Sequence, residues 1–444
     1  MTSKPNVNTS INLYDQAEIL IPGKTQLISR RASSHAYPIS PIYAKHAKGS
    51  KFTDVDGNEY IDWVNAVTAV ILGHSDDVVD NAVKNQIDKG SIYTLNSPLE
   101  IELAELLNEE IPSSEMVRYT KGGGDACTVA IRIARGVTGK DKVIFSGYHG
   151  WHDWYQAANF GADPVTGEFP FAGIEPIGIP QALAGTVFPF AEGDIDTLTK
   201  HLEENKGEVA AIMMEPMRSM LPPDGYLEKV QELAKSNGAI LIFDEVSCGW
   251  RMSVGGAQKY LGITPDMSVF AKCMSNGYAM GCVVGSKEIM QDADKMFISS
   301  SYWSDNIGLA ASITTINELK NRNSESKFKE IGDKLTNALN GAIESSGISA
   351  ITQGIHTRPT ISFSLPDSSI GPKVNTLFIQ EMSKRGIYGT TAFCATLSHT
   401  DEDIELTARA AEESFRVVLK GLEGSLDELI ETEIKQEPFR RIVS

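Results

Sequence analysis

Apolar and polar positions between residues 98 and 315 follow two alternating patterns. Short, nearly uninterrupted apolar runs are typical of strands buried on both faces of a parallel sheet. These runs predict strands at 115–120, 142–146, 209–214 and 239–243. Apolar residues spaced three or four positions apart predict amphipathic helices at 98–109, 125–136 and 226–237. Strands that alternate with helices indicate βαβ units, so we expect an α/β domain with a mainly parallel sheet.

The rest of the chain shows different patterns. Residues 51–64 predict two short strands around an Asp-Gly-Asn turn. Long helical patterns occupy 316–345 and 401–422, and the run TISFSL at 360–365 predicts a short strand between them. This last third therefore indicates a smaller α/β domain. Residues 1–45 show little periodicity, and we expect them to wrap over the surface or over a partner.

These changes of pattern divide the chain into three parts. A length of 444 residues is sufficient for two or three domain-sized units. We expect an N-terminal segment that packs with the small domain, a large domain that carries the binding site, and a C-terminal small domain. Their predicted boundaries are 1–75, 76–315 and 316–444.

The charge balance limits the classes of partner. The sequence has 40 Lys and Arg against 58 Asp and Glu, which gives a formal charge of −18. Nucleic acids and anionic membranes favour basic surfaces, so neither is expected as a partner. The N-terminal residues lack the apolar core of a signal peptide, and no run approaches the ~18 apolar residues of a membrane span. Five scattered cysteines without a CxxC pair suggest reduced thiols, so we expect a cytoplasmic protein.

A run of three glycines, Gly122 to Gly124, lies between a predicted strand and a predicted helix. A glycine turn that enters a helix can hold a phosphate on its free backbone N–H groups, although a tight turn without a ligand has the same pattern. The spacing does not fit a dinucleotide fingerprint, because Cys127 stands where glycine or alanine is needed. Asp141 also precedes the next strand instead of ending it. The pattern therefore disfavours an NAD-dependent enzyme.

The segment SGYHGWHDW at 146–154 places two histidines among aromatic residues. His149 and His152 could bind a metal, but neither an HExxH spacing nor a carboxylate-rich setting supports one. Flat side chains in this segment could equally stack on a planar ligand. We interpret His152 as a structural histidine and predict no metal site.

Two further positions complete a pattern. Asp244 ends an apolar strand, at the edge where α/β sheets bind ligands. Lys272 lies in the apolar run FAKCMSNGYAMG, where burial would lower the pKa of its amine, although a lysine that reaches solvent is the alternative. A phosphate cradle, an aromatic stacker, a strand-end carboxylate and a buried lysine thus occur in order along the chain. Together they predict a pyridoxal phosphate (PLP) site.

Further motifs extend this pattern over nearly the whole chain. They are LIPG (20–23), DVDGNEYID (54–62), LGH (72–74), YHG (148–150), EP (215–216), LPPDGYL, LIFDEV, GGAQKYLGITPDMSVFAK and LSHTDEDI (397–404). With these motifs the sequence resembles the class III (subgroup II) aminotransferases of PLP fold type I. Within them it is similar to the branch that contains glutamate-1-semialdehyde aminomutase. The block from Asp244 to Lys272 is the most specific part of the resemblance.

The resemblance implies a role for each residue of the cofactor site. Lys272 would form the internal aldimine and later move a proton, while Asp244 would pair with the pyridine nitrogen. Tyr148 and Val246 would lie on opposite faces of the ring. The other implied cofactor-binding residues are Gly123, Gly124, His149, Ser300 and Ser301.

The resemblance also implies a homodimer with an active site at each subunit interface. Gly123 and Gly124 would cradle the phosphate, and Ser300 and Ser301 would reach the phosphate of the neighbouring subunit, with Ser301 as the hydroxyl donor. The other partners would be a small-molecule amino donor and a carbonyl acceptor.

Some positions depart from the family pattern. The turn at 122–124 replaces the usual Ser-Gly-Thr or Ser-Gly-Ser, so backbone groups must compensate for a lost hydroxyl. Arg30 is the candidate for the arginine that holds the substrate carboxylate, and Thr391 stands near the place of an aminomutase carboxylate. Together with Glu215 of the EP motif, these two are the candidate substrate residues.

Several functions remain open. The first is PLP-dependent transfer of an amino group from a donor to a carbonyl acceptor through a Schiff base on Lys272. The second is an intramolecular 2,1-aminomutase reaction on a substrate like glutamate 1-semialdehyde. A non-catalytic PLP-fold binder is opposed by the intact pair Lys272 and Asp244, and an NAD oxidoreductase by the failed glycine spacing.

Overall fold

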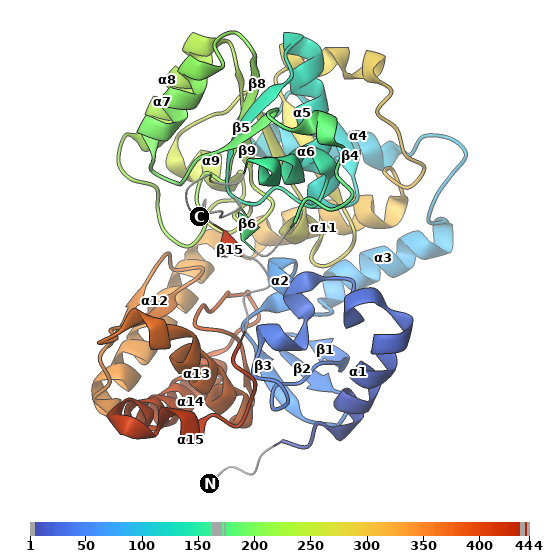
Figure 1. Cartoon of the computed structure of the whole chain (residues 1–444). Coiled ribbons are helices and arrows are strands. Elements are labelled where there is room, and N and C mark those ends of the chain that lie inside the picture. Colours follow the sequence, from blue (N-terminus) through green and yellow to red (C-terminus); the bar gives the residue numbers. More distant parts are fainter. Residues whose placement is uncertain (1–4, 162–170, 173–174, 436–439, 442–444) are drawn as a thin grey trace. The chain divides into compact units, whose positions relative to one another are not determined.

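The structure is a computed structural model that describes residues 5–161, 171–172, 175–435 and 440–441 (Figure 1). The chain divides into two compact units. Unit 1 consists of Met1–Asp76 and Ser326–Pro438, and unit 2 consists of Asp77–Glu325 and Phe439–Ser444. Each unit has a hydrophobic core of its own.

Unit 2 is built on a seven-stranded sheet with the order β4-β11-β10-β9-β8-β5-β7. β11 is antiparallel to both of its neighbours, and the other six strands are parallel to one another. The strands are β4 (Met116–Thr120), β5 (Lys142–Ser146), β7 (Val187–Pro189), β8 (Val209–Met214), β9 (Ile240–Asp244), β10 (Met267–Phe270) and β11 (Gly281–Gly285). β4, β5, β8 and β9 confirm the four strands predicted in this region, and the sheet is mainly parallel, as expected.

Helices cover both faces of this sheet (Figure 1). Successive residues of a strand point to opposite faces. Ala211 and Met213 of β8 pack in the same core cluster as α5 (Gly123–Thr138), whereas Ile212 and Met214 pack with α7 (Ile195–Glu204) and α8 (Tyr226–Asn237). Because both faces are buried, β8 is apolar throughout, which explains the uninterrupted run VAAIMM.

The remaining helices of unit 2 flank this core. They are α3 (Asp77–Lys89), α4 (Pro98–Glu110), α6 (Asp153–Gln156), α9 (Gly256–Leu261), α10 (Lys287–Met290) and α11 (Asn306–Asn321). Short 3₁₀ turns include η6 (Lys272–Ser275) after β10 and η7 (Gln291–Met296) after α10. α4 begins at a capping box, in which Ser97 Oγ accepts the backbone N–H of Leu99 and the Glu100 carboxylate accepts the backbone N–H of Ser97.

Unit 1 combines a four-stranded sheet, β1-β2-β3-β14, with a hairpin and several helices. Its strands are β1 (Ala44–Lys48), β2 (Lys51–Asp54), β3 (Glu59–Asp62), β12 (Ala350–Gln353), β13 (Thr360–Phe363) and β14 (Ile387–Tyr388). Its helices are α1 (Asn8–Leu20), α2 (Asn65–Thr68), α12 (Ser324–Ser346, beginning in unit 2), α13 (Gly371–Lys384), α14 (Asp401–Lys420) and α15 (Leu426–Leu429). Leu335, Phe378 and Phe415 connect α12, α13 and α14 in the core of this unit.

Two expectations about the helices were wrong. The helix predicted over 316–345 is two helices, α11 and α12, because Asn323 adopts a left-handed conformation (φ +50°) between them. α1 was not predicted, since only Ser10 and Ala17 of this helix are buried and its apolar period is therefore weak. The strands predicted within 51–64 are β2 and β3, and the pattern at 401–422 is α14. Among the described residues, no helix has the length and apolar character needed to cross a membrane.

Candidate active site

The carboxyl ends of β5, β8, β9 and β10 lie at one edge of the unit 2 sheet, because these strands run in the same direction. Polar side chains follow each of these ends. In chain order they are Tyr148 and His149 after β5, Glu215 after β8, Asp244 at the end of β9 and Lys272 after β10. Segments that are far apart in the sequence therefore meet at this edge.

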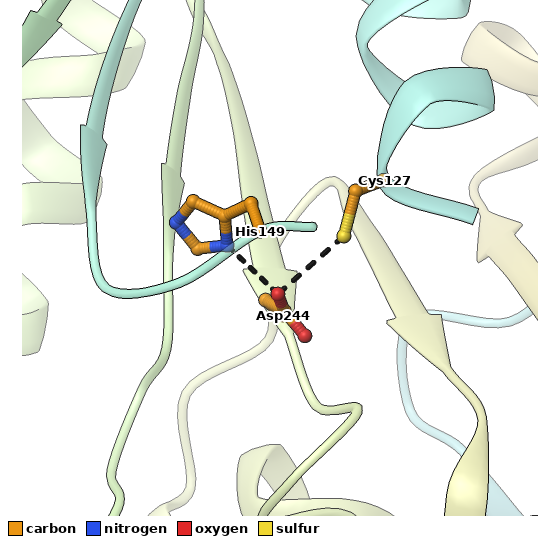
Figure 2. Close-up of side chains that lie close together, drawn as sticks. All are labelled: Cys127, His149 and Asp244. Carbon is orange, nitrogen blue, oxygen red and sulfur yellow. Dashed lines mark hydrogen bonds and ion pairs between the residues drawn. The ribbon is translucent and has the colours of Figure 1, made fainter. Parts of the chain in front are cut away.

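Asp244 is the centre of a buried cluster (Figure 2). Its Oδ2 accepts hydrogen bonds from His149 Nδ1 at 2.7 Å and from Cys127 Sγ of α5 at 3.4 Å. Its Oδ1 accepts a hydrogen bond from the backbone N–H of Val246 at 2.9 Å. Asp244, His149 and Cys127 are each no more than 2% exposed. These contacts fix the orientation of the carboxylate.

The same contacts fix the orientation of His149. Its Nε2 is 3.1 Å from the carbonyl oxygen of Ser146, and its Nδ1 is 2.7 Å from Oδ2 of Asp244. Both ring nitrogens therefore have polar partners within the fold, and the imidazole holds the carboxylate in place.

Cys127, His149 and Asp244 are also residue types that bind metal ions. Among the described residues, one ligand atom from each lies within 4.8 Å of the other two. Metal binding requires the thiolate, but burial raises the pKa of the Cys127 thiol well above its ordinary value, and nearby Asp244 acts in the same direction. Because hydrogen bonds already join these atoms, we interpret the cluster as a hydrogen-bonded group that orients Asp244.

Lys272 is held at the end of β10 in an unusual backbone conformation. Its φ of +48° lies in the left-handed region, which costs energy for a residue with a side chain. Its Nζ donates a hydrogen bond to Ser247 Oγ at 2.9 Å. Burial lowers the pKa of the amine, although the carboxylates of Glu215 and Asp244 act in the opposite direction. The lowered pKa increases the share of the neutral, nucleophilic amine at a given pH.

The start of α5 is a glycine turn that two other segments approach closely. Gly122 precedes the helix in an extended conformation. A Cβ atom on Gly123 would lie 2.7 Å from Cγ1 of Val246, so a larger residue would displace one of them. A Cβ atom on Gly150, which has a φ of +103°, would lie 2.7 Å from Cα of Gly124. The glycines thus allow the segments after β5 and β9 to close around the first turn of α5.

This first turn has backbone N–H groups that a ligand can use. The N–H groups of Gly123, Gly124 and Asp125 have no hydrogen-bond acceptor among the described residues. They lie at the positive end of the helix dipole, which attracts anions. A phosphate group is therefore the kind of ligand that the turn can hold.

Glu215 supports the turn that carries Tyr148. Its Oε2 accepts the backbone N–H of Tyr148 at 3.1 Å, and a Cβ atom on Gly147 would lie 2.7 Å from the same oxygen. Arg218 Nη1 lies 3.6 Å from this oxygen as an ion pair. Glu215 and Arg218 act electrostatically on Lys272 in opposite directions, so both belong to its surroundings. The Tyr148 side chain remains partly exposed, which leaves ring surface for a ligand.

The contacts of unit 2 bring most of the predicted site residues together. These are Gly123, Gly124, Tyr148, His149, Glu215, Asp244, Val246 and Lys272. Ser300 and Ser301 are exposed between η7 and α11, and the contacts found among the described residues do not join them to this group. Arg30 and Thr391 belong to unit 1. Their roles therefore remain predictions.

Sequence reasoning missed three side chains of this site. In the sequence, Cys127 was noted only because it does not fit a dinucleotide-binding motif. In the fold it lies one helical turn after Gly123 and faces Asp244. Ser247 is three residues from Asp244, and this short distance was an available signal. Arg218 lies in a loop after β8 and has no sequence signal of its own.

Comparisons with known proteins agree with this geometry. The family model described as "Aminotransferase class-III" matches residues 32–397. The chain is 37% identical over 432 residues to the 3-aminobutyryl-CoA aminotransferase of Cloacimonas acidaminovorans, an alignment that covers 95% of this chain and 100% of that relative. It is 32% identical over 436 residues to the glutamate-1-semialdehyde 2,1-aminomutase of Desulforamulus reducens, covering 94% and 99% of the two chains.

A solved structure confirms the predicted fold. The PLP internal aldimine form of the FumI protein from Sphingopyxis sp. MTA144 superimposes with a TM-score of 0.84 and 23% identity. The superposition covers 94% of this chain and 97% of that one. Both the α/β class and the PLP fold type I arrangement expected from the sequence are therefore correct.

Proposed function

The chain belongs to the class-III aminotransferase family, and on that premise we propose that Lys272 is its Schiff-base lysine and that it moves an amino group between two separate small molecules. Pyridoxal 5′-phosphate dependence and aminotransferase chemistry follow from the family. Beyond the family, we propose which residues carry the reaction, which substrates are used and how the subunits assemble. The observation that carries it is the position of Lys272, with its lowered pKa, at the same sheet edge as Asp244.

The residues at this edge fit PLP from end to end. The N–H groups of Gly123 and Gly124 suit the phosphate. Val246, which packs against Gly123, offers an apolar surface for one face of the ring, and the partly exposed Tyr148 offers an aromatic ring for the other. Asp244 supplies a carboxylate for the ring nitrogen, and Lys272 an amine for the aldehyde.

When bound, PLP supplies an electron sink for the carbon that carries the amino group. Asp244 would keep a proton on the ring nitrogen, which strengthens that sink. Its carboxylate is already oriented by Val246 N–H and by Cys127. His149 Nδ1, 2.7 Å from its Oδ2, is a third group that holds the carboxylate in this orientation.

Lys272 has two tasks in this proposal. Its neutral amine makes the covalent link to the cofactor, and burial favours that neutral form. Once displaced by a substrate amine, Nζ would hold the proton that leaves the amine-bearing carbon of the substrate. Ser247 Oγ, 2.9 Å from Nζ, gives the released amine a fixed hydrogen-bond partner.

We propose intermolecular transfer in preference to the intramolecular aminomutase reaction. The relative named as an aminotransferase is 37% identical, against 32% for the relative named as an aminomutase. The activity for which the first relative is named makes a β-amino acyl-CoA the first substrate to test. Glutamate 1-semialdehyde is the substrate of the second candidate function.

We also propose that the protein is a cytoplasmic homodimer with shared active sites. The segment with Ser300 and Ser301 supports this assembly, because it exposes Phe297 to 91% and Tyr302 to 67%, and large apolar side chains favour an interface. All five cysteines are free and buried, as is usual in a reducing compartment.

The test is spectroscopic. Purified protein with PLP is given single amino donors, beginning with 3-aminobutyryl-CoA, and the visible absorbance of the cofactor is followed. A true donor should bleach the band and leave pyridoxamine phosphate, and a carbonyl acceptor should restore it. Lys272→Ala should lose turnover. A protein that binds no PLP would refute the proposal, and turnover of glutamate 1-semialdehyde without an external donor or acceptor would favour the aminomutase reaction.

A further inference from the structure

His152 lies against the glycine turn that begins α5. A Cβ atom on Gly124 would be 3.3 Å from both Cε1 and Nδ1 of His152. The other ring nitrogen, Nε2, lies 3.5 Å from Oδ1 of Asp125. Trp151 stacks on the imidazole with a centroid distance of 4.6 Å, which fixes the plane of the ring. One edge of the histidine is therefore directed to the first turn of the helix.

The Nδ1 atom at this edge is buried and has no hydrogen-bond partner among the described residues. A buried polar atom without a partner is energetically costly, so such atoms usually meet a water or a ligand. The N–H groups of Gly123 and Gly124, which also lack acceptors in the described part of the chain, begin the same turn. Three donors without acceptors thus lie around one place.

This place lacks side-chain donors of its own, because residues 122–124 are all glycine. A phosphate dianion at a helix start normally draws on side chains as well as on backbone N–H groups. The ring edge of His152 occupies the space into which a side chain on Gly124 would extend. A larger residue at 124 and a histidine at 152 therefore compete for the same volume.

We propose that His152 binds the phosphate of the cofactor, with Nδ1 donating a hydrogen bond in place of the hydroxyl that the glycine turn lacks. The imidazole that does so carries hydrogen on Nδ1. This inference rests on the proposed function, since it takes the first turn of α5 as the phosphate site. It replaces the interpretation of His152 as a structural residue only.

The experiment measures the affinity of the resolved full-length protein for PLP and for pyridoxal, which has no phosphate. His152→Gln places an amide near the position of Nε2, whereas His152→Asn places one near that of Nδ1. The glutamine variant should bind PLP roughly 10- to 100-fold more weakly, the usual effect of losing a hydrogen bond to a charged group. The asparagine variant should retain most of the affinity. Affinity for pyridoxal should be equal in the wild type and both variants.

A matched control uses another histidine of unit 2. His201 also has a buried Nδ1 without a partner in the described residues, but its Nε2 faces the Pro189 carbonyl oxygen at 3.1 Å, on the opposite face of the sheet. His201→Gln should leave the affinity for PLP unchanged. The ³¹P chemical shift of bound PLP should move in His152→Gln and not in His201→Gln.

A reciprocal exchange separates phosphate binding from packing. In His152→Ala the space beside Gly124 opens, so Gly124→Ser can return a hydroxyl to the site. The double variant should regain affinity for PLP that the single His152→Ala variant loses. Equal losses for PLP and pyridoxal, or no loss for either, would overturn the role of His152. A wild-type protein that binds no PLP would refute the proposed function as well as the role of His152.

Discussion

Asp244 receives hydrogen bonds from an imidazole, a thiol and a backbone N–H group, so its carboxylate has little freedom to rotate. These donors come from α5 and from the segments after β5 and β9. A carboxylate fixed in this way would need no reorganisation to pair with the ring nitrogen of the cofactor in the proposed site. The chemistry of the site therefore depends on residues that do not touch the substrate.

Ser247 offers a direct test of how the Lys272 amine is controlled. Its Oγ accepts a hydrogen bond from Nζ, and an acceptor stabilises the charged form of an amine. Ser247→Ala should therefore lower the pKa of Lys272 further. The rate of PLP attachment, followed by absorbance against pH, should persist to lower pH in this variant. Ser247→Thr keeps the hydroxyl and is the control, and identical profiles for alanine and wild type would contradict this role.

Glu245, beside Asp244, links stability to pH. It is fully buried, and burial raises the pKa of its carboxyl from 4.5 to about 7, although Gln258 and Ala257 donate hydrogen bonds to it. The unfolded chain therefore loses this proton at a lower pH than the folded chain. The contribution of Glu245 to stability is complete below the unfolded pKa and is lost as the pH rises through about 7.

The expected loss is about 3 kcal/mol in the free energy of unfolding. Glu245→Gln cannot titrate, so urea unfolding between about pH 5 and about pH 8 should show a weaker decline in the variant than in the wild type. A decline of equal size in both proteins would show that Glu245 does not carry this dependence.

Single residues of the site differ in how far the sequence predicts them. Asp244 and Lys272 can be predicted, because apolar runs locate the strands and a polar residue at a strand end lies at the ligand edge. The contacts of Cys127 and Ser247 cannot be predicted from the sequence, since they depend on the rotation of α5 about its axis and on the path of the turn after β9. His152 was predicted to be structural, because the sequence does not reveal that its Nδ1 lacks a hydrogen-bond partner. This feature becomes visible only in the folded chain.

At the scale of elements, the junction between α5 and the segment after β9 has little spare volume. A Cβ atom in Gly123→Ala would lie 2.7 Å and 2.9 Å from the two Cγ atoms of Val246. Such overpacking costs about 1–3 kcal/mol, so this variant should melt at a lower temperature and bind PLP more weakly. Removal of both Cγ atoms in Gly123→Ala/Val246→Ala should restore part of the stability.

Gly341 in α12 provides the matched control for this prediction. A Cβ atom there would meet nothing within 4 Å, and its φ is not in the left-handed region. Gly341→Ala should therefore be neutral or stabilise the helix by up to about 1 kcal/mol. A Gly123→Ala protein that melts like the wild type would disprove the packing argument.

The elements themselves were predictable where burial is complete. β8 and β9 are apolar because helices cover both faces of the sheet, and this burial produces the runs seen in the sequence. α1 buries little and leaves a weak pattern. The boundary between α11 and α12 depends on the left-handed Asn323, which a helical pattern does not reveal.

At the scale of the whole molecule, the proposed homodimer can be tested with two inactive chains. If Ser301 serves the phosphate of the partner subunit, a dimer of Lys272→Ala with Ser301→Ala contains one site with both changes and one site with neither. Mixed dimers should therefore regain up to half the activity of the wild type, measured after co-expression with two affinity tags. Parent homodimers of each variant are the controls. No gain over the parents would mean that each site uses residues of one chain.

The sheet order also governs when the site can form. β4 lies at the edge of the seven-stranded sheet, and among the described residues its strand partner is β11, whose residues follow roughly 160 positions later. At the usual rates of translation, β4 waits roughly 10 to 30 s for its partner to be synthesised. The glycine turn after β4 lacks the support of a paired strand before then, so we expect a nascent chain that stops short of residue 281 to bind PLP poorly. Capture of PLP is thus expected late in the making of each subunit, after Lys272 itself has been synthesised.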